Sequence, residues 1–172
     1  MGSGSGRMPN TTRVWAPWRS HVLSQRKMGR CIFCTAKRAR RQDRSRYVLA
    51  RGARVFALLN RYPYTNGHFM IAPYRHIGSL GVFSAAEWLE TLRLCRRLMA
   101  RAQRALRPHG FNIGFNVGRV AGAGFPGHIH LHVVPRWKGD TNFMPVLSDT
   151  RIMSQSLEEV YTLLSDTRRT SR

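Results

Sequence analysis

Acidic residues, cysteines and long apolar runs are all scarce in this chain of 172 residues. It has 8 acidic residues against 29 basic ones, and only 3 cysteines. Three cysteines are too few for a disulfide scaffold. No apolar run approaches the roughly 18 residues that a membrane span needs, and no signal-peptide pattern is present. We therefore expect a cytoplasmic protein that does not enter a membrane.

The shortage of acidic residues leaves a net charge of +21, which is concentrated in the first half of the chain. Between Arg7 and Ala86 the only acidic residue is Asp43. Such a charge favours polyanionic partners, among them polyphosphates, nucleotides and nucleic acid. A solvated arginine-rich surface without a specific ligand explains the charge equally well, so the count alone identifies no partner.

The length suits one domain rather than two. After Met1, residues 2–6 alternate Gly and Ser and are typical of a linker, so we predict that residues 1–12 are linker and disordered N-terminus. A single domain is expected over residues 13–165, followed by a polar tail over 166–172. A short helix is expected after Cys34, up to Arg41. The expected strands cover residues 47–50, 54–59, 68–72, 111–117 and 128–135.

The clearest element is a long helix that begins after Ser84. Ser84 and Glu87 form a capping box, and Pro108 ends the helix. Its apolar residues recur in steps of four and three, and these are Trp88, Leu92, Cys95, Met99, Ala102 and Leu106. A second capping box, Ser156 with Glu159, begins a shorter helix. Strands around one long helix predict an α+β domain on an antiparallel sheet.

Three of the seven histidines fall in the segment Gly127-His-Ile-His-Leu-His-Val-Val-Pro135. On a strand alternate side chains share a face, so His128, His130 and His132 are expected to line one surface. Two chemistries fit this pattern: direct metal binding by all three, or a nucleophilic central imidazole assisted by a neighbour. The glycine-rich residues 120–127 precede the histidines, and backbone amides of such a loop favour phosphate chemistry.

A second chemical motif is Cys31-Ile-Phe-Cys34. In a cytosolic chain this spacing indicates a metal site or a redox pair before it indicates a structural bridge. Cys95, in contrast, lies on the apolar side of the expected long helix and is predicted to be a core residue.

Residues 128–134 resemble the signature of the histidine triad family, in which three histidines alternate with apolar residues. The resemblance extends to Val55-Phe-Ala-Leu-Leu-Asn60 and Gly67-His-Phe-Met-Ile-Ala-Pro73. It also includes Trp15-Ala-Pro-Trp-Arg19 and Pro135-Arg-Trp-Lys-Gly-Asp-Thr-Asn-Phe-Met144. These segments are similar to a bacterial branch related to diadenosine tetraphosphate phosphorylases and hydrolases. The fold that this implies is a five-stranded antiparallel sheet with one long and one shorter helix, usually in a homodimer.

The resemblance also implies roles for individual residues. His130 would be the nucleophile that forms a nucleotidyl-histidine, with His132 at the α-phosphate oxygens and His128 as the third catalytic histidine. The implied nucleotide-binding residues are Asn60 (at the ribose), His68, Asn116, Gly124 and His132. The implied ligands of a structural zinc ion are Cys31, Cys34, His76 and His128. That zinc would tether the N-terminal segment to the sheet, and no organic cofactor is implied.

The implied function is cleavage of the α-phosphate linkage of dinucleoside polyphosphates. The segment Gly122-Ala-Gly-Phe-Pro-Gly127 lacks the Gln and Ser or Thr of many histidine triad hydrolases, which disfavours phosphoramidate hydrolysis. The stretch around Arg136 and Trp137 slightly favours phosphate over water as the acceptor. The alternatives are a nucleoside phosphoramidate hydrolase and a nucleic-acid-binding or adenylylated-end processing protein. Nucleic acid is not favoured as a partner, because few aromatics are interleaved with the arginines.

Overall fold

The computed structural model describes residues 30–38, 40–123, 125, 127–140 and 154–165. Five strands form one antiparallel sheet in the order β1-β2-β3-β5-β4. These strands are β1 (Val48–Arg51), β2 (Val55–Leu59), β3 (Phe69–Pro73), β4 (Gly110–Phe115) and β5 (Leu131–Arg136). The predicted fold class and five-stranded sheet are therefore confirmed.

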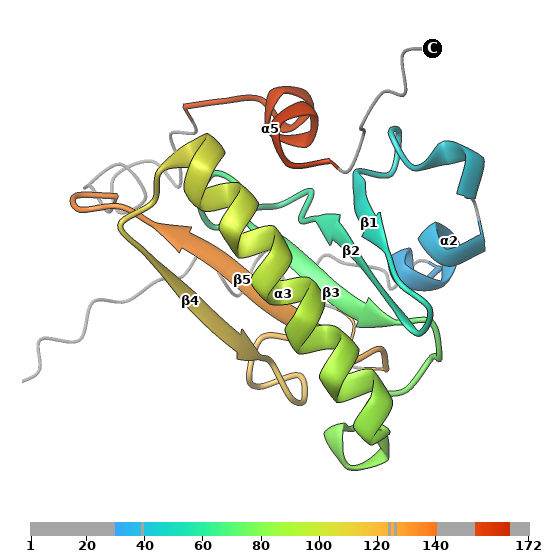
Figure 1. Cartoon of the computed structure of the whole chain (residues 1–172). Helices are drawn as coiled ribbons and strands as arrows, with labels where there is room; N and C mark the ends of the chain where they lie inside the picture. Colours follow the sequence, from blue (N-terminus) through green and yellow to red (C-terminus); the bar gives the residue numbers. More distant parts are fainter. Residues whose placement is uncertain (1–29, 39, 124, 126, 141–153, 166–172) are drawn as a thin grey trace, which may run out of the picture.

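Three α-helices accompany the sheet within the described residues (Figure 1). They are α2 (Ile32–Arg38), α3 (Ala85–Leu106) and α5 (Leu157–Leu164). The expected short helix thus starts before Cys34, and a 3-10 turn at Arg40–Gln42 follows it. Both predicted capping boxes are present, at Ser84 and at Ser156. No helix in the described ranges has the length and apolar character that crossing a membrane requires.

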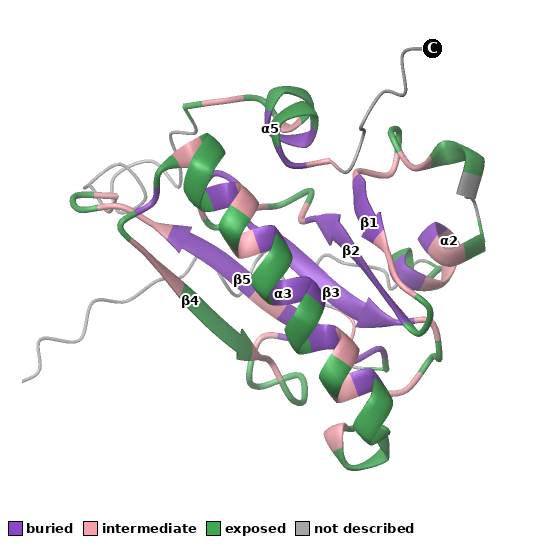
Figure 2. Cartoon of the chain, in the orientation of Figure 1, coloured by how far each residue is buried: buried purple, intermediate pink, exposed green. Residues whose placement is uncertain are grey.

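The two faces of the sheet carry separate apolar clusters. Helices α3 and α5 pack on one face, where Leu98 and Leu164 meet sheet residues such as Val133. Helix α2 packs on the other face, where Phe33 and neighbouring sheet residues form a smaller cluster. The central strands are largely buried, whereas the residues of the edge strand β4 are all half-buried or exposed (Figure 2).

The side of α3 that faces the sheet differs from the predicted one. Thr91, Leu94 and Leu98 are buried beside Cys95, whereas Leu92 is 59% exposed. The predicted apolar stripe is therefore wrong in part. The apolar surface of α3 is wider than this stripe, and the stripe covers only one edge of it. Cys95 is buried, as predicted.

The histidine segment also differs from the prediction. Strand β5 begins at Leu131, so His128 and His130 precede it rather than lie on it. Both His128 and His130 are buried. The predicted N-terminal linker, the Trp15–Trp18 motif and the polar tail lie outside the described residues, as does Gly124.

Candidate active site and metal-binding cluster

The imidazole of His130 is oriented by its own backbone neighbourhood. Its Nδ1 lies 2.8 Å from the carbonyl oxygen of His128, an acceptor, so Nδ1 carries the proton. The Nε2 atom of the neutral ring then keeps its lone pair. Burial lowers the pKa of His130 to about 4, so the ring is neutral at pH 7. His130 therefore has the tautomer that a nucleophile requires.

His132 is held in the complementary tautomer by His68. The backbone N–H of Tyr64 donates to Nδ1 of His68 at 3.1 Å, which leaves the His68 proton on Nε2. That Nε2 lies 3.0 Å from Nδ1 of His132, which must accept. The proton of neutral His132 is consequently on Nε2, a buried atom without a partner among the described residues.

The two rings therefore present a lone pair and a donor side by side. The centroids of His130 and His132 are 4.6 Å apart. Burial also lowers the pKa of His132, so its donor is the neutral N–H. An unpaired buried donor is costly unless a ligand pairs with it. A phosphoryl oxygen fits this position, since the nucleophile would then lie beside the phosphorus.

The other predicted nucleotide-binding residues surround this pair. Asn60 follows β2 and is half-buried. Its Nδ2 lies 3.3 Å from Nδ1 of His68, and its Oδ1 accepts from the Tyr62 N–H at 3.0 Å. Asn116 follows β4 and donates to the Gly122 carbonyl at 3.4 Å, which fastens the glycine-rich loop. His68 is fully buried and acts on His132 rather than facing open solvent.

The four predicted metal ligands meet in one cluster. The ligand atoms of Cys31, Cys34, His76 and His128 all lie within 4.8 Å of one another. The Sγ–Nδ1 and Nδ1–Nδ1 distances among Cys34, His76 and His128, and between Cys31 and His128, run from 3.2 to 3.7 Å. A tetrahedron with bonds of about 2.0–2.3 Å has edges of roughly 3.3–3.8 Å. The cluster therefore has the size and donor set of a closed tetrahedral site.

His128 connects the cluster to the sheet and to His130. Its Nε2 donates to the Pro73 carbonyl at 2.9 Å, which leaves the Nδ1 lone pair turned towards the cysteines. Burial lowers the pKa of His128 to about 4, which favours the neutral ligand form. Its carbonyl accepts the His130 proton. His128 thus contacts the ring of His130 through its backbone carbonyl rather than through a hydrogen bond from its own ring.

Sequence reasoning missed two aromatic residues near the histidines. The sequence patterns assign no role to Phe33, yet its ring centroid lies 4.6 Å from that of His130. Tyr64 stacks on His68, with centroids 4.7 Å apart. The position of Phe33 inside the Cys31-Ile-Phe-Cys34 motif was the available signal for the first. No local pattern indicated the second.

The stretch that had favoured a phosphate acceptor lies at the other end of β5. Arg136 pairs with Asp140, and the Trp137 Nε1–H donates to the Leu106 carbonyl at 3.3 Å. The first contact closes the turn after β5, the second joins that turn to the end of α3, and neither involves His128, His130 or His132. The described part of the stretch therefore gives no reason to prefer phosphate over water.

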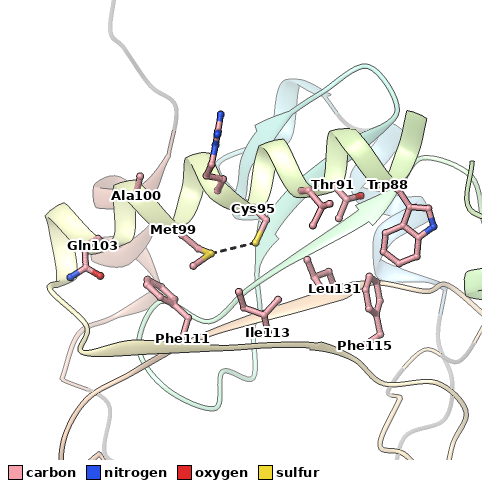
Figure 3. A pocket seen from close by; sticks show the side chains of 12 residues that line it. Trp88, Thr91, Cys95, Met99, Ala100, Gln103, Phe111, Ile113, Phe115 and Leu131 are labelled. Atoms are coloured by element: carbon pink, nitrogen blue, oxygen red, sulfur yellow. Dashed lines mark hydrogen bonds between the residues drawn. The ribbon is translucent and has the colours of Figure 1, made fainter. Parts of the chain in front are cut away.

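A groove of about 510 Å³ lies between α3 and β4 (Figure 3). Apolar side chains such as Trp88, Leu92 and Phe111 dominate it, and Leu131 forms its floor. Leu131 packs with the α3-side cluster, so this groove is on the sheet face opposite His130 and His132. Few polar groups converge there, and it suits packing better than phosphate chemistry.

The sheet and its histidines place the chain in the HIT family, whose domain matches residues 41–139. The AP-4-A phosphorylase of Mycobacterium tuberculosis is 35% identical over 94% of this chain and 87% of that relative. A zinc-bound histidine triad family protein from Mycobacterium smegmatis has a solved structure with a TM-score of 0.60. It is 28% identical, and the match covers 78% of this chain and 90% of that one. The adenosine 5'-monophosphoramidase of Schizosaccharomyces pombe is 28% identical over 62% of this chain and 74% of its own length.

Proposed function

We propose that this HIT protein cleaves dinucleoside polyphosphates by nucleophilic attack of His130 on the α-phosphorus. The proposal rests on the two tautomers derived above: His130 keeps a lone pair on Nε2, and His132 carries its proton on Nε2. The Nε2 lone pair of His130 forms the N–P bond while the bond from phosphorus to the bridging oxygen breaks. The Nε2–H of His132 donates to a phosphoryl oxygen as charge develops there. The leaving nucleotide departs with the bridging oxygen.

An acceptor then attacks the nucleotidyl-histidine and restores free His130. Water as acceptor makes a hydrolase, and inorganic phosphate makes a phosphorylase that releases a nucleoside diphosphate. We slightly favour phosphate as the acceptor, because the chain is similar to the mycobacterial AP-4-A phosphorylase. The similarity to a monophosphoramidase supports nucleoside phosphoramidate hydrolysis as the second candidate.

Substrate binding is proposed to use the residues around the pair. Asn60 binds the ribose hydroxyls through the hydrogen-bonding capacity of its side-chain amide that the contacts with His68 and Tyr62 do not use. Asn116 and the loop that contains Gly124 bind the phosphates. The high positive charge supports an anionic substrate with several phosphates. It does not by itself support nucleic acid as a partner.

We also propose that the Cys31–Cys34–His76–His128 cluster binds structural zinc. Two thiolates and two imidazoles leave no open position, so the ion would stabilise the fold and would not contact substrate. The His128–Pro73 contact is the outer hydrogen bond that commonly orients a ligating histidine. The zinc would hold α2 and the chain that precedes it against the sheet.

A homodimer is the proposed assembly, with a second copy covering the groove between α3 and β4. Strand β4 is an edge strand whose Ile113 is 48% exposed, and Leu92 across the groove is also exposed. An uncovered edge strand beside an apolar groove is typical of an interface. We propose a cytoplasmic location for the protein, which immunolocalisation in intact cells would test.

Incubation with diadenosine tetraphosphate, with and without inorganic phosphate, tests the function. ADP and ATP formed only with phosphate would identify a phosphorylase, and AMP and ATP without phosphate would identify a hydrolase. His130→Ala should abolish either reaction, whereas His109→Ala, at an exposed histidine, should leave it unchanged. Equal turnover by His130→Ala would exclude His130 as nucleophile.

A further inference from the structure

Phe33 is the point at which the metal cluster, the nucleophile and the glycine-rich loop meet. It lies on α2 between the two cysteines, and its side chain is fully buried. Its ring centroid is 4.9 Å from that of His128 and 4.6 Å from that of His130. On another side it meets Phe125, edge to face, at 6.3 Å.

The ring of His130 needs these contacts because a single hydrogen bond does not hold it fully. The hydrogen bond from His130 Nδ1 to the His128 carbonyl restrains one edge of the imidazole ring. The opposite edge, which carries Nε2, can still move. Phe33 and His132 each approach the ring with centroids at 4.6 Å, tilted by 37° and 61°. Aromatic contacts at this separation are attractive and have preferred geometries. Phe33 therefore restricts the movement of His130 Nε2, the reactive nitrogen.

The place of Phe33 depends in turn on the cysteines that flank it. Cys31 immediately precedes α2, and Cys34 lies in its first turn. Both thiols approach Nδ1 of His128, at 3.4 and 3.7 Å. Since residues 32–34 are adjacent in a helix, a metal that binds both cysteines also fixes the backbone that carries Phe33.

We propose that Phe33 is a positioning residue through which occupancy of the metal cluster orders the His130 imidazole. The metal would thereby affect turnover although it contacts no substrate. The kinetic part of this inference rests on the proposed function, whereas the part concerning the order of the ring does not.

Phe33→Leu and Phe33→Met test the inference, with Ile32→Val as the matched control in the same turn. Ile32 is 37% exposed and belongs to neither site. All four proteins are prepared with zinc, and their zinc content, folded spectrum and long-range 1H–15N correlations of the histidine rings are compared. The His130 signals are identified by their loss in His130→Asn. Wild-type protein stripped by a chelator provides the metal-free reference.

We expect the Phe33 variants to bind one zinc each and to show broadened or shifted His130 signals that resemble those of the stripped wild type. The kcat for diadenosine tetraphosphate should fall about 10- to 100-fold, with KM changed less than about threefold. Ile32→Val should behave as wild type in every measurement. The Met variant preserves side-chain bulk, so it remains informative if Phe33→Leu does not fold.

Unchanged His130 signals in a zinc-loaded Phe33 variant would overturn the inference, as would signals in the stripped wild type identical to those with zinc. A change confined to KM would overturn it too, since Phe33 would then act on binding alone. If the wild type does not turn over the dinucleotide, the proposed function fails, but the spectra still decide whether Phe33 orders His130.

Discussion

Nε2 of His68 lies 3.0 Å from Nδ1 of His132, and this contact determines which nitrogen of His132 carries its proton. The direction of the hydrogen bond follows from Tyr64, whose N–H already donates to the other nitrogen of His68. A residue outside the three consecutive histidines therefore sets the tautomer of His132, which would be the donor in the proposed reaction. His68 is fully buried and stacked under Tyr64, so this arrangement has little freedom to reverse.

His68→Phe removes that donor and frees His132 to adopt either tautomer. We expect kcat to fall about 10- to 100-fold, because the correct donor is then present only part of the time. His68→Gln retains an amide donor and should keep more activity than His68→Phe. Steady-state kinetics check this, with His109→Phe as control. A His68→Phe enzyme within twofold of wild type would show that the His68 contact is not needed.

Gly127→Ala should weaken the metal site. A Cβ at Gly127 would lie 3.3 Å from Nε2 of His76, which is tighter than an ordinary contact, so the imidazole and its Nδ1 must shift by a few tenths of an ångström. We expect the affinity for zinc to fall about tenfold, comparable with the effect of disturbing a ligand's support. Competition with a chromophoric chelator measures it. Gly81→Ala, whose Cβ would meet only Ser79 Oγ at 3.6 Å, is the control. Equal affinities in both variants would contradict the predicted role of His76.

Glu87 predicts a specific dependence of stability on pH. Hydrogen bonds from Arg75 and from Ser84 lower the pKa of this buried carboxyl from 4.5 to about 2. The lowered pKa belongs to the folded state, so the stabilisation is complete above about pH 4.5 and is lost as the pH falls towards 2.

Glu87→Gln should therefore cost about 1–3 kcal/mol at pH 7, and progressively less as the pH falls through this range. Urea unfolding at several pH values measures the difference in the free energy of unfolding. The exposed Glu158→Gln serves as control. A difference between Glu87→Gln and wild type that stays constant from pH 5 to pH 2.5 would exclude the linkage.

Leu92→Glu tests the proposed dimer. The side chain of Leu92 is exposed and lines the groove between α3 and β4. A carboxylate buried there by a second copy would lack hydration, so we expect the variant to be monomeric at concentrations at which the wild type is a dimer. Sedimentation equilibrium distinguishes the two. The exposed Leu163→Glu on α5 lies outside the groove and should leave the assembly unchanged. A monomeric wild type would refute the dimer directly.

Local patterns in the sequence predicted much of the fold. Ser84 with Glu87 and Ser156 with Glu159 marked the two helix starts correctly, because a capping box involves residues only three positions apart. The periodicity of α3 located only part of its buried face, which includes Cys95 and Ala102 but not Leu92. Leu94 and Leu98 on one side and Leu92 on the other are all apolar, and only the position of the sheet distinguishes them.

The same distinction applies to the candidate site. The cysteine pair and the histidines were apparent as motifs, and the resemblance to the histidine triad family connected Cys31 and Cys34 with His76 and His128. The tautomer of His132 was not apparent, since it depends on His68, which is 64 residues away in the chain. Phe33 was missed for a similar reason, because a residue 97 positions from His130 shows its contact only in three dimensions.

The central claim is that His130 becomes covalently bonded to the nucleotide. Rapid acid-free denaturation of the protein during turnover of diadenosine tetraphosphate, followed by intact-mass and peptide mass spectrometry, tests it most directly. We predict a fraction of the protein with the added mass of one nucleoside monophosphate, located on His130 and absent from His130→Ala. Turnover by the wild type with no such adduct at any time, or an adduct on another residue, would contradict the account.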